Sequence, residues 1–538
     1  MSAIPFFDCN CQIGVRANRH KSTIWRLEDY RRDFDYCDIV GAVVSHAVAR
    51  EYSPDYGNRR LLREIGDDPQ LVPQWVLIPH HTGEMPPAPE LVAEMLSLGV
   101  RTARIMPKTN VTGTSEAIIG PLLSELERHR VPLFVDKSEI DLPDLVQLCQ
   151  AHPMLPVVLC GQSWGGGRTL YPALAAAPNL HIETWAYQEH RAYEEFIRRF
   201  GPERLLFGTD LPNRSPGAAT MMTRYEDISK EARHMIAGGN LMRLLKDVRG
   251  AQGRPLPELK APATHPDDDP IVACTRAGKP LSDEFVLDAH GHIAHPGAMG
   301  VYIPLAYNDA DNLVKSMDRM GIDICCFSPW SGIITGDPEA NDISLDAVER
   351  HPDRLLAYGC DNPNYPEFFN AEYERVFLTD RVIGYKPYPR HGLPFDHPAL
   401  APLMEWANAN EKPVLCHAMR PDISEKLAAK YPSAKFLVAH AGSSWDLAEG
   451  TARVAREFKN VYAEITYTSI LYGFIEFFCE EVCPEQLLFG SDCVMRDIAP
   501  QLGWVTWARI PYEDKQKVLG QNMADILKMP MEQRTPRS

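Results

Sequence analysis

Short, nearly continuous apolar runs alternate with longer amphipathic stretches along both halves of the 538-residue chain. In the second half the apolar runs read FVLDAH, ICCFSP, LLAYGC, VIGYKP, PVLCHA, KFLVAH, NVYAEI and QLLFGS. Segments with helical periodicity, such as Asp396–Asn410 and Asp446–Phe458, lie between them. Continuous apolar runs, rather than strict alternation, are typical of parallel strands covered on both faces. Strand–helix units repeated eight times in about 250 residues predict a (β/α)8 barrel.

The first half of the chain repeats this frame. It carries FFDCNCQ, LFVDK, VVLCGQ and LLFGTD where the second half carries VLDAHGH, VLCHA, FLVAHAG and LLFGSD. Most corresponding positions lie 280 to 282 residues apart, from Asp8 and Asp288 near the start to Asn240 and Asn522 near the end. A constant offset over a whole domain marks a tandem duplication. The chain is therefore predicted to belong to the α/β class and to fold as two tandem (β/α)8 barrels of the TIM type.

Composition sets the expected domain boundaries. A segment rich in proline and aspartate, RPLPELKAPATHPDDDP, separates the two copies, and such a segment cannot form a core of its own. We expect a linker over residues 249–283, between a first barrel over residues 1–248 and a second barrel over residues 284–538.

The overall composition is that of an ordinary globular protein, with 45% hydrophobic and 24% charged residues. The net charge of −17 argues against nucleic acid or a membrane surface as the main partner, because both attract positive charge. The 13 cysteines form no evenly spaced disulfide framework, and no apolar stretch has the length of a membrane span. The chain starts without a leader pattern. We expect a cytoplasmic protein that acts on a small molecule, with its oligomeric state left open.

Imidazoles follow the predicted strands of the second half. His290 and His292 are two positions apart, so that in a strand both side chains point to one face, about 7 Å apart. Further imidazoles, His417 and His440, and the carboxylate of Asp492 come after other strands. Since catalytic residues of such barrels gather at the C-terminal rim, we expect an N/O site for Zn²⁺, with Mn²⁺ or another divalent metal as an alternative. Water bound to such a metal has a lowered pKa and becomes a nucleophile.

The first half has lost these imidazoles. The five corresponding positions hold Asn10, Gln12, Asp136, Gly161 and Asp210. Amide side chains are weak ligands for Zn²⁺, and glycine has no side chain to offer. We therefore expect a barrel without metal ligands that serves as a scaffold. Two alternatives remain: aspartates that hold a hard cation, and an anion-binding remnant at Arg104, which corresponds to Lys386.

These motifs resemble the amidohydrolase superfamily, in particular its amidohydrolase-related branch of hydrolases and decarboxylases. The motifs that carry the resemblance are DAHGH at 288–292, GYKPYP at 384–389, His417, HAG at 440–442, LLFGSD at 487–492 and Gln521-Asn522-Met523. The resemblance covers both halves outside the linker, with a degenerate first copy. It implies a metal held by four side chains, those of His290, His292, His417 and Asp492. It further implies that Asp492 and His440 are catalytic and move protons, with His440 as a ligand to a second metal in members that bind two.

The resemblance also implies a substrate site at the rim of the second barrel. Lys386 stands on strand four, where some members carry a carbamylated lysine between two metals. Binding of an anionic substrate by this lysine, or a simple solvated role, are the alternatives. The candidates for substrate binding are Lys386, Arg390, Arg420, Trp445 and Arg496. The three arginines follow strands four, five and eight and could clamp a carboxylate through paired hydrogen bonds.

Several other residues follow the predicted strands. The further candidates for the rim are Trp330, Tyr365, His391 and Tyr467, each of which could line the pocket or pack in the barrel. Glu464 has a counterpart, Glu183, in the half where no metal is expected. Its presence in both copies favours a structural role, such as a hydrogen bond between strands.

Three functions fit these residues. The first is metal-dependent hydrolysis of a small-molecule amide, lactone or ester by an activated water in the second barrel. The alternative is non-oxidative decarboxylation of an aromatic or unsaturated carboxylic acid, which relatives in the same branch perform with nearly the same ligands. Many of those relatives have a glycine-rich stretch after the strand-six histidine, where this chain reads HAGSSW. The third is a non-catalytic binding protein, which the intact set of five residues in the second half disfavours.

Overall fold

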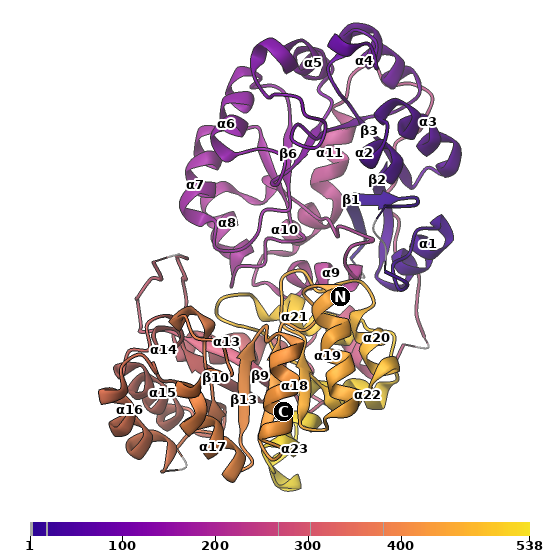
Figure 1. Ribbon diagram of the computed structural model, residues 1–538. Helices are drawn as coiled ribbons and strands as arrows, with labels where there is room; N and C mark the ends of the chain where they lie inside the picture. The colour runs from indigo at the N-terminus through magenta and orange to yellow at the C-terminus, as the bar shows by residue number, and fades with distance from the viewer. Residues whose placement is uncertain (1–3, 18–19, 267, 302, 380, 538) are drawn as a thin grey trace. The chain divides into compact units, whose positions relative to one another are not determined.

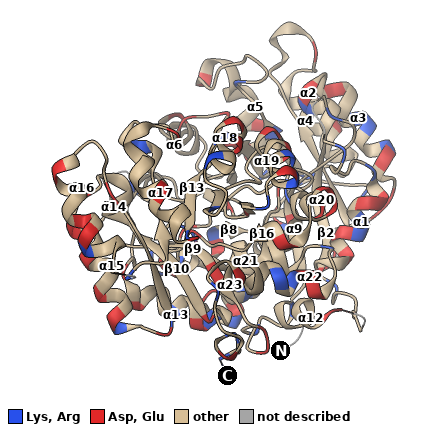
Figure 2. Ribbon diagram, turned by 60° about the horizontal axis from the view of Figure 1, so that its bottom comes forward, with Lys and Arg blue, Asp and Glu red and all other residues tan. Residues whose placement is uncertain are grey.

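A computed structural model of the chain describes residues 4–17, 20–266, 268–301, 303–379 and 381–537. The chain divides into two compact units, Met1–Pro266 and Asp267–Ser538. Each unit is a ring of parallel strands surrounded by helices (Figure 1). Acidic and basic residues lie mainly on the outer helices (Figure 2). Within the described ranges, no helix combines the length and the hydrophobicity that a membrane crossing requires.

The first unit contains eight parallel strands that pair in sequence order. They are β1 (Phe6–Ile13), β2 (Ile39–His46), β3 (Leu71–Val76), β4 (Thr102–Ile105), β5 (Leu133–Asp136), β6 (Val157–Cys160), β7 (Leu180–Glu183) and β8 (Leu205–Leu206). The ring closes between its first and last members, because Cys9 N donates to Phe207 O at 2.9 Å and Cys11 forms a parallel bridge with Leu211.

Helices of the first unit cover the outside of this ring. They are α1 (Leu27–Tyr36), α2 (Ala47–Glu51), α3 (Pro54–Ile65), α4 (Ala88–Ser97), α5 (Glu116–His129), α6 (Leu142–Ala151), α7 (Gly167–Ala176), α8 (Ala192–Phe200), α9 (Pro216–Tyr225), α10 (Lys230–His234) and α11 (Asn240–Lys246). The strands bury both faces: in β5, Leu133 and Val135 pack against the helices, whereas Phe134 packs inside the ring with Phe7 and Val158. Two buried layers explain why the strands read as continuous apolar runs.

The second unit repeats the pattern with β9 (Leu287–Ile293), β10 (Ile324–Pro329), β11 (Leu355–Gly359), β12 (Gly384–Tyr385), β13 (Pro413–His417), β14 (Lys435–Ala439), β15 (Val461–Glu464) and β16 (Leu487–Leu488). These strands also pair in sequence order. Closure again joins the first strand to the residues after the last, through Ala289 N and Phe489 O at 3.0 Å. The predicted fold of two tandem (β/α)8 barrels is confirmed.

The helices of the second unit are α12 (Pro270–Arg276), α13 (Ala310–Met320), α14 (Trp330–Ile334), α15 (Glu339–Arg350), α16 (Pro366–Glu372), α17 (Ala401–Ala409), α18 (Pro421–Lys430), α19 (Trp445–Glu457), α20 (Phe474–Glu481), α21 (Ile498–Thr506), α22 (Tyr512–Gln516) and α23 (Asn522–Ile526). The helix expected over Asp446–Phe458 is α19. The one expected over Asp396–Asn410 is α17, which starts later because a 3-10 turn with Pro398 at its first position precedes it.

The duplication is visible in local detail as well as in topology. A π-helical turn comes directly before the last helix of each barrel, at Met235–Gly239 and at Lys517–Gln521. The asparagine that follows each turn bonds to the last strand: Asn240 Nδ2 donates to Leu205 O at 2.9 Å, and Asn522 Nδ2 to Leu487 O at 2.8 Å. The retained asparagines therefore attach the final helix to strand eight.

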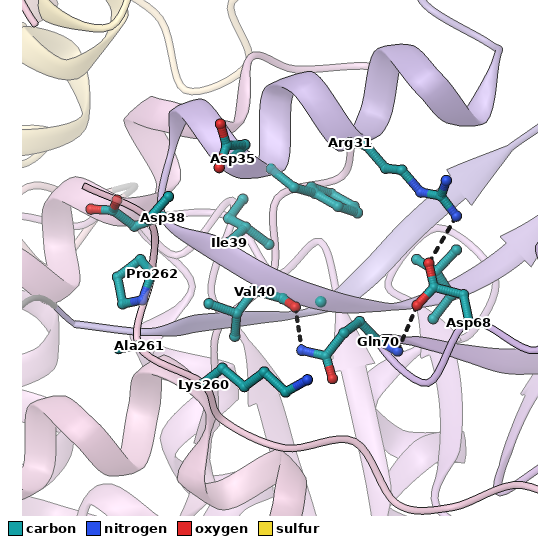
Figure 3. Close-up of a pocket in the computed structure, with 14 residues that line it drawn as sticks. Arg31, Asp35, Asp38, Ile39, Val40, Asp68, Gln70, Lys260, Ala261 and Pro262 are labelled. Carbon is teal, nitrogen blue, oxygen red and sulfur yellow. Dashed lines mark hydrogen bonds and ion pairs between the residues drawn. The ribbon is translucent and has the colours of Figure 1, made fainter. Parts of the chain in front are cut away.

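The segment between the two copies packs against the barrels: its part before residue 267 contacts the first unit, and its part after residue 267 belongs to the second. Before residue 267, Arg249 N donates to His129 O at 2.8 Å, and Gln70 Nε2 donates to Glu258 O at 3.2 Å. Residues 260–263 line one side of a pocket of about 340 Å³, opposite the start of β2 (Figure 3). After residue 267 the chain forms α12, in which Ile271 is fully buried.

Candidate metal centre

Strand ends of the second barrel bring the predicted imidazoles and the aspartate together. His290 and His292 lie in β9, and His417 ends β13. His440 directly follows β14, and Asp492 lies in the loop after β16, which ends at Leu488. Four of the five are buried, whereas His417 is half-buried. Ligand atoms lie within 4.8 Å of one another in two groups, His290 with His292 and Asp492, and His290 with His440 and Glu464. Among the described residues both groups belong to the second unit.

The partners of His290 and His292 leave one ring nitrogen of each directed at Asp492. His292 Nδ1 is 3.2 Å from the Ser328 carbonyl oxygen, which can only accept, so Nδ1 carries the proton. His290 Nδ1 is 3.1 Å from Glu464 Oε2. Both Nε2 lone pairs then face Asp492 Oδ1, at 3.0 Å from His292 and 3.8 Å from His290. Rings held at Nδ1 by an acceptor are the usual arrangement of metal-binding histidines.

The protonation states of these rings suit metal binding. Burial, and after it the charge of Lys386, lowers the pKa of His290 and His292 well below the ordinary value. Both imidazoles are therefore neutral at pH 7, the form that binds a metal. Two neutral imidazoles and a carboxylate converge on one point, and this donor set fits a divalent cation of the Zn²⁺ or Mn²⁺ type.

His440 and His417 form a second pair at the rim. His440 Nδ1 donates to Thr466 O at 2.6 Å, so its Nε2 carries a lone pair. His417 Nδ1 lies 3.0 Å from that Nε2 and donates to it. Burial and Lys386 lower the pKa of His417 to about 3, and burial and His417 lower that of His440 well below its ordinary value. The structure places His417 against His440 and outside both ligand groups.

Two buried cations stand beside the imidazoles. Lys386 directly follows β12 and its Nζ lies 3.1 Å from His290 Nε2; burial lowers its pKa to about 8, although Glu464 opposes the shift. Arg496 pairs with Asp492 through Nη1, and its Nε donates to Thr468 Oγ1 at 2.7 Å. Burial lowers the pKa of Arg496 to about 10, so it remains charged at neutral pH.

The other three predicted substrate-binding residues have different surroundings. Arg390 is exposed in the 3-10 turn Pro389–His391. Arg420 has a side chain that is 74% exposed and pairs with Asp422 at 2.7 Å. Trp445 begins α19, and its ring meets the ring of Phe477 edge-on at 5.4 Å. Of the five candidates, the structure therefore brings Lys386 and Arg496 to the cluster.

Glu464 has a larger role than the sequence indicated. Its Oε1 accepts from Thr466 N at 2.7 Å and its Oε2 from His440 N at 3.4 Å, which joins neighbouring strands as expected. Glu183 makes the equivalent bonds, accepting from Trp185 N at 2.6 Å and Gly161 N at 3.2 Å. Glu464 additionally holds His290. Burial raises the pKa of Glu464 to about 8, against the effect of its hydrogen bond with Thr466.

Three aromatic rings complete the surroundings of the imidazoles. Trp330 lies 6.1 Å from His292 between ring centroids, Tyr467 5.5 Å from His440, and Tyr388 5.0 Å from His417. All three rings are only half-buried. Tyr388 was not among the sequence candidates, although it lies in the GYKPYP motif two positions after Lys386. Alternate residues of an extended segment share a face, and this spacing could have identified it.

Several solved structures are similar to parts of this chain. The crystal structure of 2,6-dihydroxybenzoate decarboxylase from Rhizobium is 15% identical, covers 46% of this chain and 99% of its own, and has a TM-score of 0.40. Dihydroxybenzoic acid decarboxylase from Polaromonas sp. JS666, solved with bound manganese and 2-nitroresorcinol, is 16% identical, covers 46% and 99%, and has a TM-score of 0.38. A putative amidohydrolase from Staphylococcus aureus is 15% identical, covers 45% and 99%, and has a TM-score of 0.37.

No curated protein matches the chain significantly. A family model described as "Amidohydrolase" matches residues 26–246 and 330–528. These two stretches fall on the two barrels and together include most of the chain. The matched residues lie in both copies of the barrel, and the chain belongs to the amidohydrolase family.

Proposed function

We propose that the second barrel is a metal-dependent enzyme that removes the carboxyl group of an aromatic carboxylic acid. The sequence placed hydrolysis first and decarboxylation second. The charges and rings around the imidazoles favour the reverse order. Decarboxylases of aromatic acids also occur among the solved structures with this fold.

The observation that carries the proposal is the pair of buried cations, Lys386 and Arg496. The acidic side chains beside them are Asp492, which pairs with Arg496, and Glu464, whose pKa burial raises to about 8. A divalent cation on the neutral imidazoles would leave this buried site with excess positive charge. Buried charge is unfavourable without a counter-ion, and a substrate carboxylate would provide one.

The three half-buried rings indicate the rest of the substrate. Trp330, Tyr388 and Tyr467 each stand beside a different imidazole of the cluster. Aromatic side chains pack favourably against a planar ring. A flat acid, such as a hydroxylated benzoate, fits both the rings and the charges.

We assign the metal ligands to His290, His292 and Asp492, with His417 as the fourth ligand expected at the same rim. When bound, Mn²⁺ or Zn²⁺ supplies a Lewis acid that withdraws electrons from the substrate oxygens.

The side chains of the barrel would direct the bond cleavage. Lys386 and Arg496 would hold the carboxylate against the cluster. The bond between ring and carboxylate breaks, carbon dioxide leaves, and the electron pair stays on the ring carbon, which takes up a proton. The ring proton of His440 is on Nδ1, bonded to Thr466 O, so the proton for the carbon would come from water, and His440 and Asp492 would pass it on.

Hydrolysis of an amide, lactone or ester remains the second candidate. It would use the same imidazoles and aspartate, and it is supported by membership in a family that is described as amidohydrolases. The two reactions differ in their products, so one panel of substrates separates them.

The test is to incubate the protein with Mn²⁺ or Zn²⁺ and hydroxylated benzoates, and in parallel with lactones and amides. We expect carbon dioxide release from a benzoate and no acid release from the other compounds. His292→Ala should abolish both bound metal, measured by elemental analysis, and turnover. His351→Ala is the matched control, because His351 is a surface histidine of the same barrel that pairs with Asp311. Full activity after chelation, or turnover of lactones or amides alone, would contradict the proposal.

A further inference from the structure

A fully buried guanidinium, that of Arg104, lies inside the first barrel. Arg104 lies in β4 and is 0% exposed. Its Nε donates to Gln74 Oε1 at 2.6 Å, its Nη1 to Asp136 Oδ1 at 2.7 Å and its Nη2 to Asn10 Oδ1 at 2.8 Å. These acceptors belong to β3, β5 and β1. Arg104 therefore joins its own strand to three others from inside the ring.

Two of these acceptors stand where the second barrel has its imidazoles. Asn10 corresponds to His290, and Asp136 corresponds to His417. The guanidinium of Arg104 thus bonds to the side chains at positions from which metal ligands are proposed in the other barrel. A guanidinium offers a planar set of donors with a permanent positive charge, which suits a carboxylate and an amide oxygen.

The charge of Arg104 is compensated within the barrel. Asp136 accepts from Arg104 with one oxygen and from Arg50 Nη2, at 2.9 Å, with the other. Burial opposes ionisation of Asp136, but the two guanidiniums outweigh burial and hold its pKa below the ordinary value. The ion pair is therefore formed at neutral pH. Loss of either partner would strongly destabilise the barrel, because the remaining buried ion would have no counter-ion.

The same contacts leave little for a metal ion to bind. Within the described residues of the first unit, no three potential ligand atoms converge. The amide oxygens of Asn10 and Gln12 are weaker ligands than imidazoles. The guanidinium already takes the oxygens of Asn10 and Asp136 that a divalent ion would need.

We propose that Arg104 is the resident cation of the first barrel. Its guanidinium stands in for a divalent metal ion, joins the strand ends that such an ion would join, and closes this barrel to metals. The comparison with the second barrel rests on the metal site proposed above, whereas the contacts of Arg104 do not depend on it. The first barrel is then a metal-independent fold that keeps a positive charge at its centre.

The first experiment replaces the guanidinium in the full-length chain. Arg104→Met keeps an unbranched side chain and removes the charge and the donors. We expect amide hydrogen exchange in β1, β3 and β5 to become about 100-fold faster or more, because breaking a buried ion pair destabilises the elements it joins. Exchange in the second barrel should not change. Arg243→Met is the control, since Arg243 is an exposed arginine of the same barrel that bonds to Glu203 O. If the amides of Arg104→Met exchange as slowly as those of the unaltered protein, the proposal is wrong.

A second set of variants addresses the pair itself. Asp136→Asn leaves Arg104 buried without its carboxylate, and Arg104→Met/Asp136→Asn removes both charges. An unpaired buried charge destabilises more than an uncharged pair. The double variant should therefore be more stable in urea unfolding than Asp136→Asn alone. Additive losses of stability would show that the two residues do not act as a unit and would overturn the proposal.

The third experiment tests closure to metals. The variant His290→Ala/His292→Ala, dialysed against Mn²⁺, should contain no bound ion by elemental analysis. If this variant binds one equivalent of Mn²⁺, and a further Asp136→Asn change removes that ion, the metal lies in the first barrel and the proposal is wrong. Absence of metal from the unaltered chain would instead contradict the proposed function and leave the role of Arg104 intact.

Discussion

At the scale of single residues, His290 is the side chain shared by both ligand groups. Glu464 holds its Nδ1 at 3.1 Å and so directs its Nε2 towards Asp492. Asp492 has a φ of 58°, a conformation that costs a non-glycine residue about 1–3 kcal/mol and is common at functional sites. Asp210 has the same φ of 58° in the first barrel. The turn therefore belongs to the fold, and the imidazoles distinguish the second barrel.

Glu464→Gln should weaken metal binding. Glutamine has one acceptor oxygen where Glu464 has two, so it cannot accept from both His290 and Thr466, and loss of such an outer partner typically lowers metal affinity about 10- to 100-fold. The measurement is competition with a chelator for Mn²⁺ or Zn²⁺. Glu183→Gln is the matched control, because Glu183 makes the same strand contacts without an imidazole. Equal affinities of Glu464→Gln and the unaltered protein would show that this glutamate does not orient a ligand.

Arg496→Lys should impair substrate binding. The lysine keeps a charge for Asp492 but loses the planar pair of donors, and hydrogen bonds to charged groups contribute about 1.5–3 kcal/mol. We expect KM for a benzoate to rise about 10-fold or more with a smaller change in kcat, measured by steady-state kinetics. Arg214→Lys is the control at the corresponding position of the first barrel. A lower kcat at unchanged KM would contradict a role in substrate binding.

At the scale of elements, the strands position the site and the helices stabilise it. β9 places His290 and His292 two residues apart on one face, and β15 places Glu464 beside them.

α12 lies within the segment expected to be a linker. Asp269 caps this helix through Val272 N at 2.8 Å and pairs with Lys515 at 2.6 Å. We propose that the second domain begins with α12.

Ile271→Ala tests whether α12 is part of the second domain. Ile271 is 0% exposed, and truncation of a buried isoleucine typically costs about 2–5 kcal/mol. Urea unfolding of the second barrel should show a loss of this size. Leu256→Ala, in the preceding segment where Leu256 is 39% exposed, should change stability little. A similar small effect for both variants would mean that residues 270–276 act as a linker.

At the scale of the molecule, two copies of one fold have different charges at their centres. The first barrel holds a buried guanidinium, and the second holds neutral imidazoles whose lone pairs converge. Only the second arrangement offers a donor set that fits a divalent cation. We therefore expect the stability of the two barrels to respond differently to metal.

Chelation should destabilise one barrel selectively. A ligand present at about 100 times its Kd stabilises the folded state by about 2.7 kcal/mol, and 1 kcal/mol corresponds to about 2–4 °C in domains of this size. Treatment with EDTA should lower the unfolding temperature of the second barrel by about 5–10 °C and leave the first unchanged. Barrel-resolved hydrogen exchange at increasing temperature measures both. An equal shift of both barrels would contradict a single metal-binding barrel.

The amino-acid sequence by itself determined the duplication, the (β/α)8 fold and the contrast between the two copies. These features depend on apolar periodicity and on a constant offset, which are local properties of the chain. Tertiary structure decided what lies between the strands: the contact of Glu464 with His290, the position of His417 against His440, and the burial of Arg496 while Arg420 is exposed. Those contacts join residues far apart in the chain, and their geometry depends on the register and twist of a closed ring of strands.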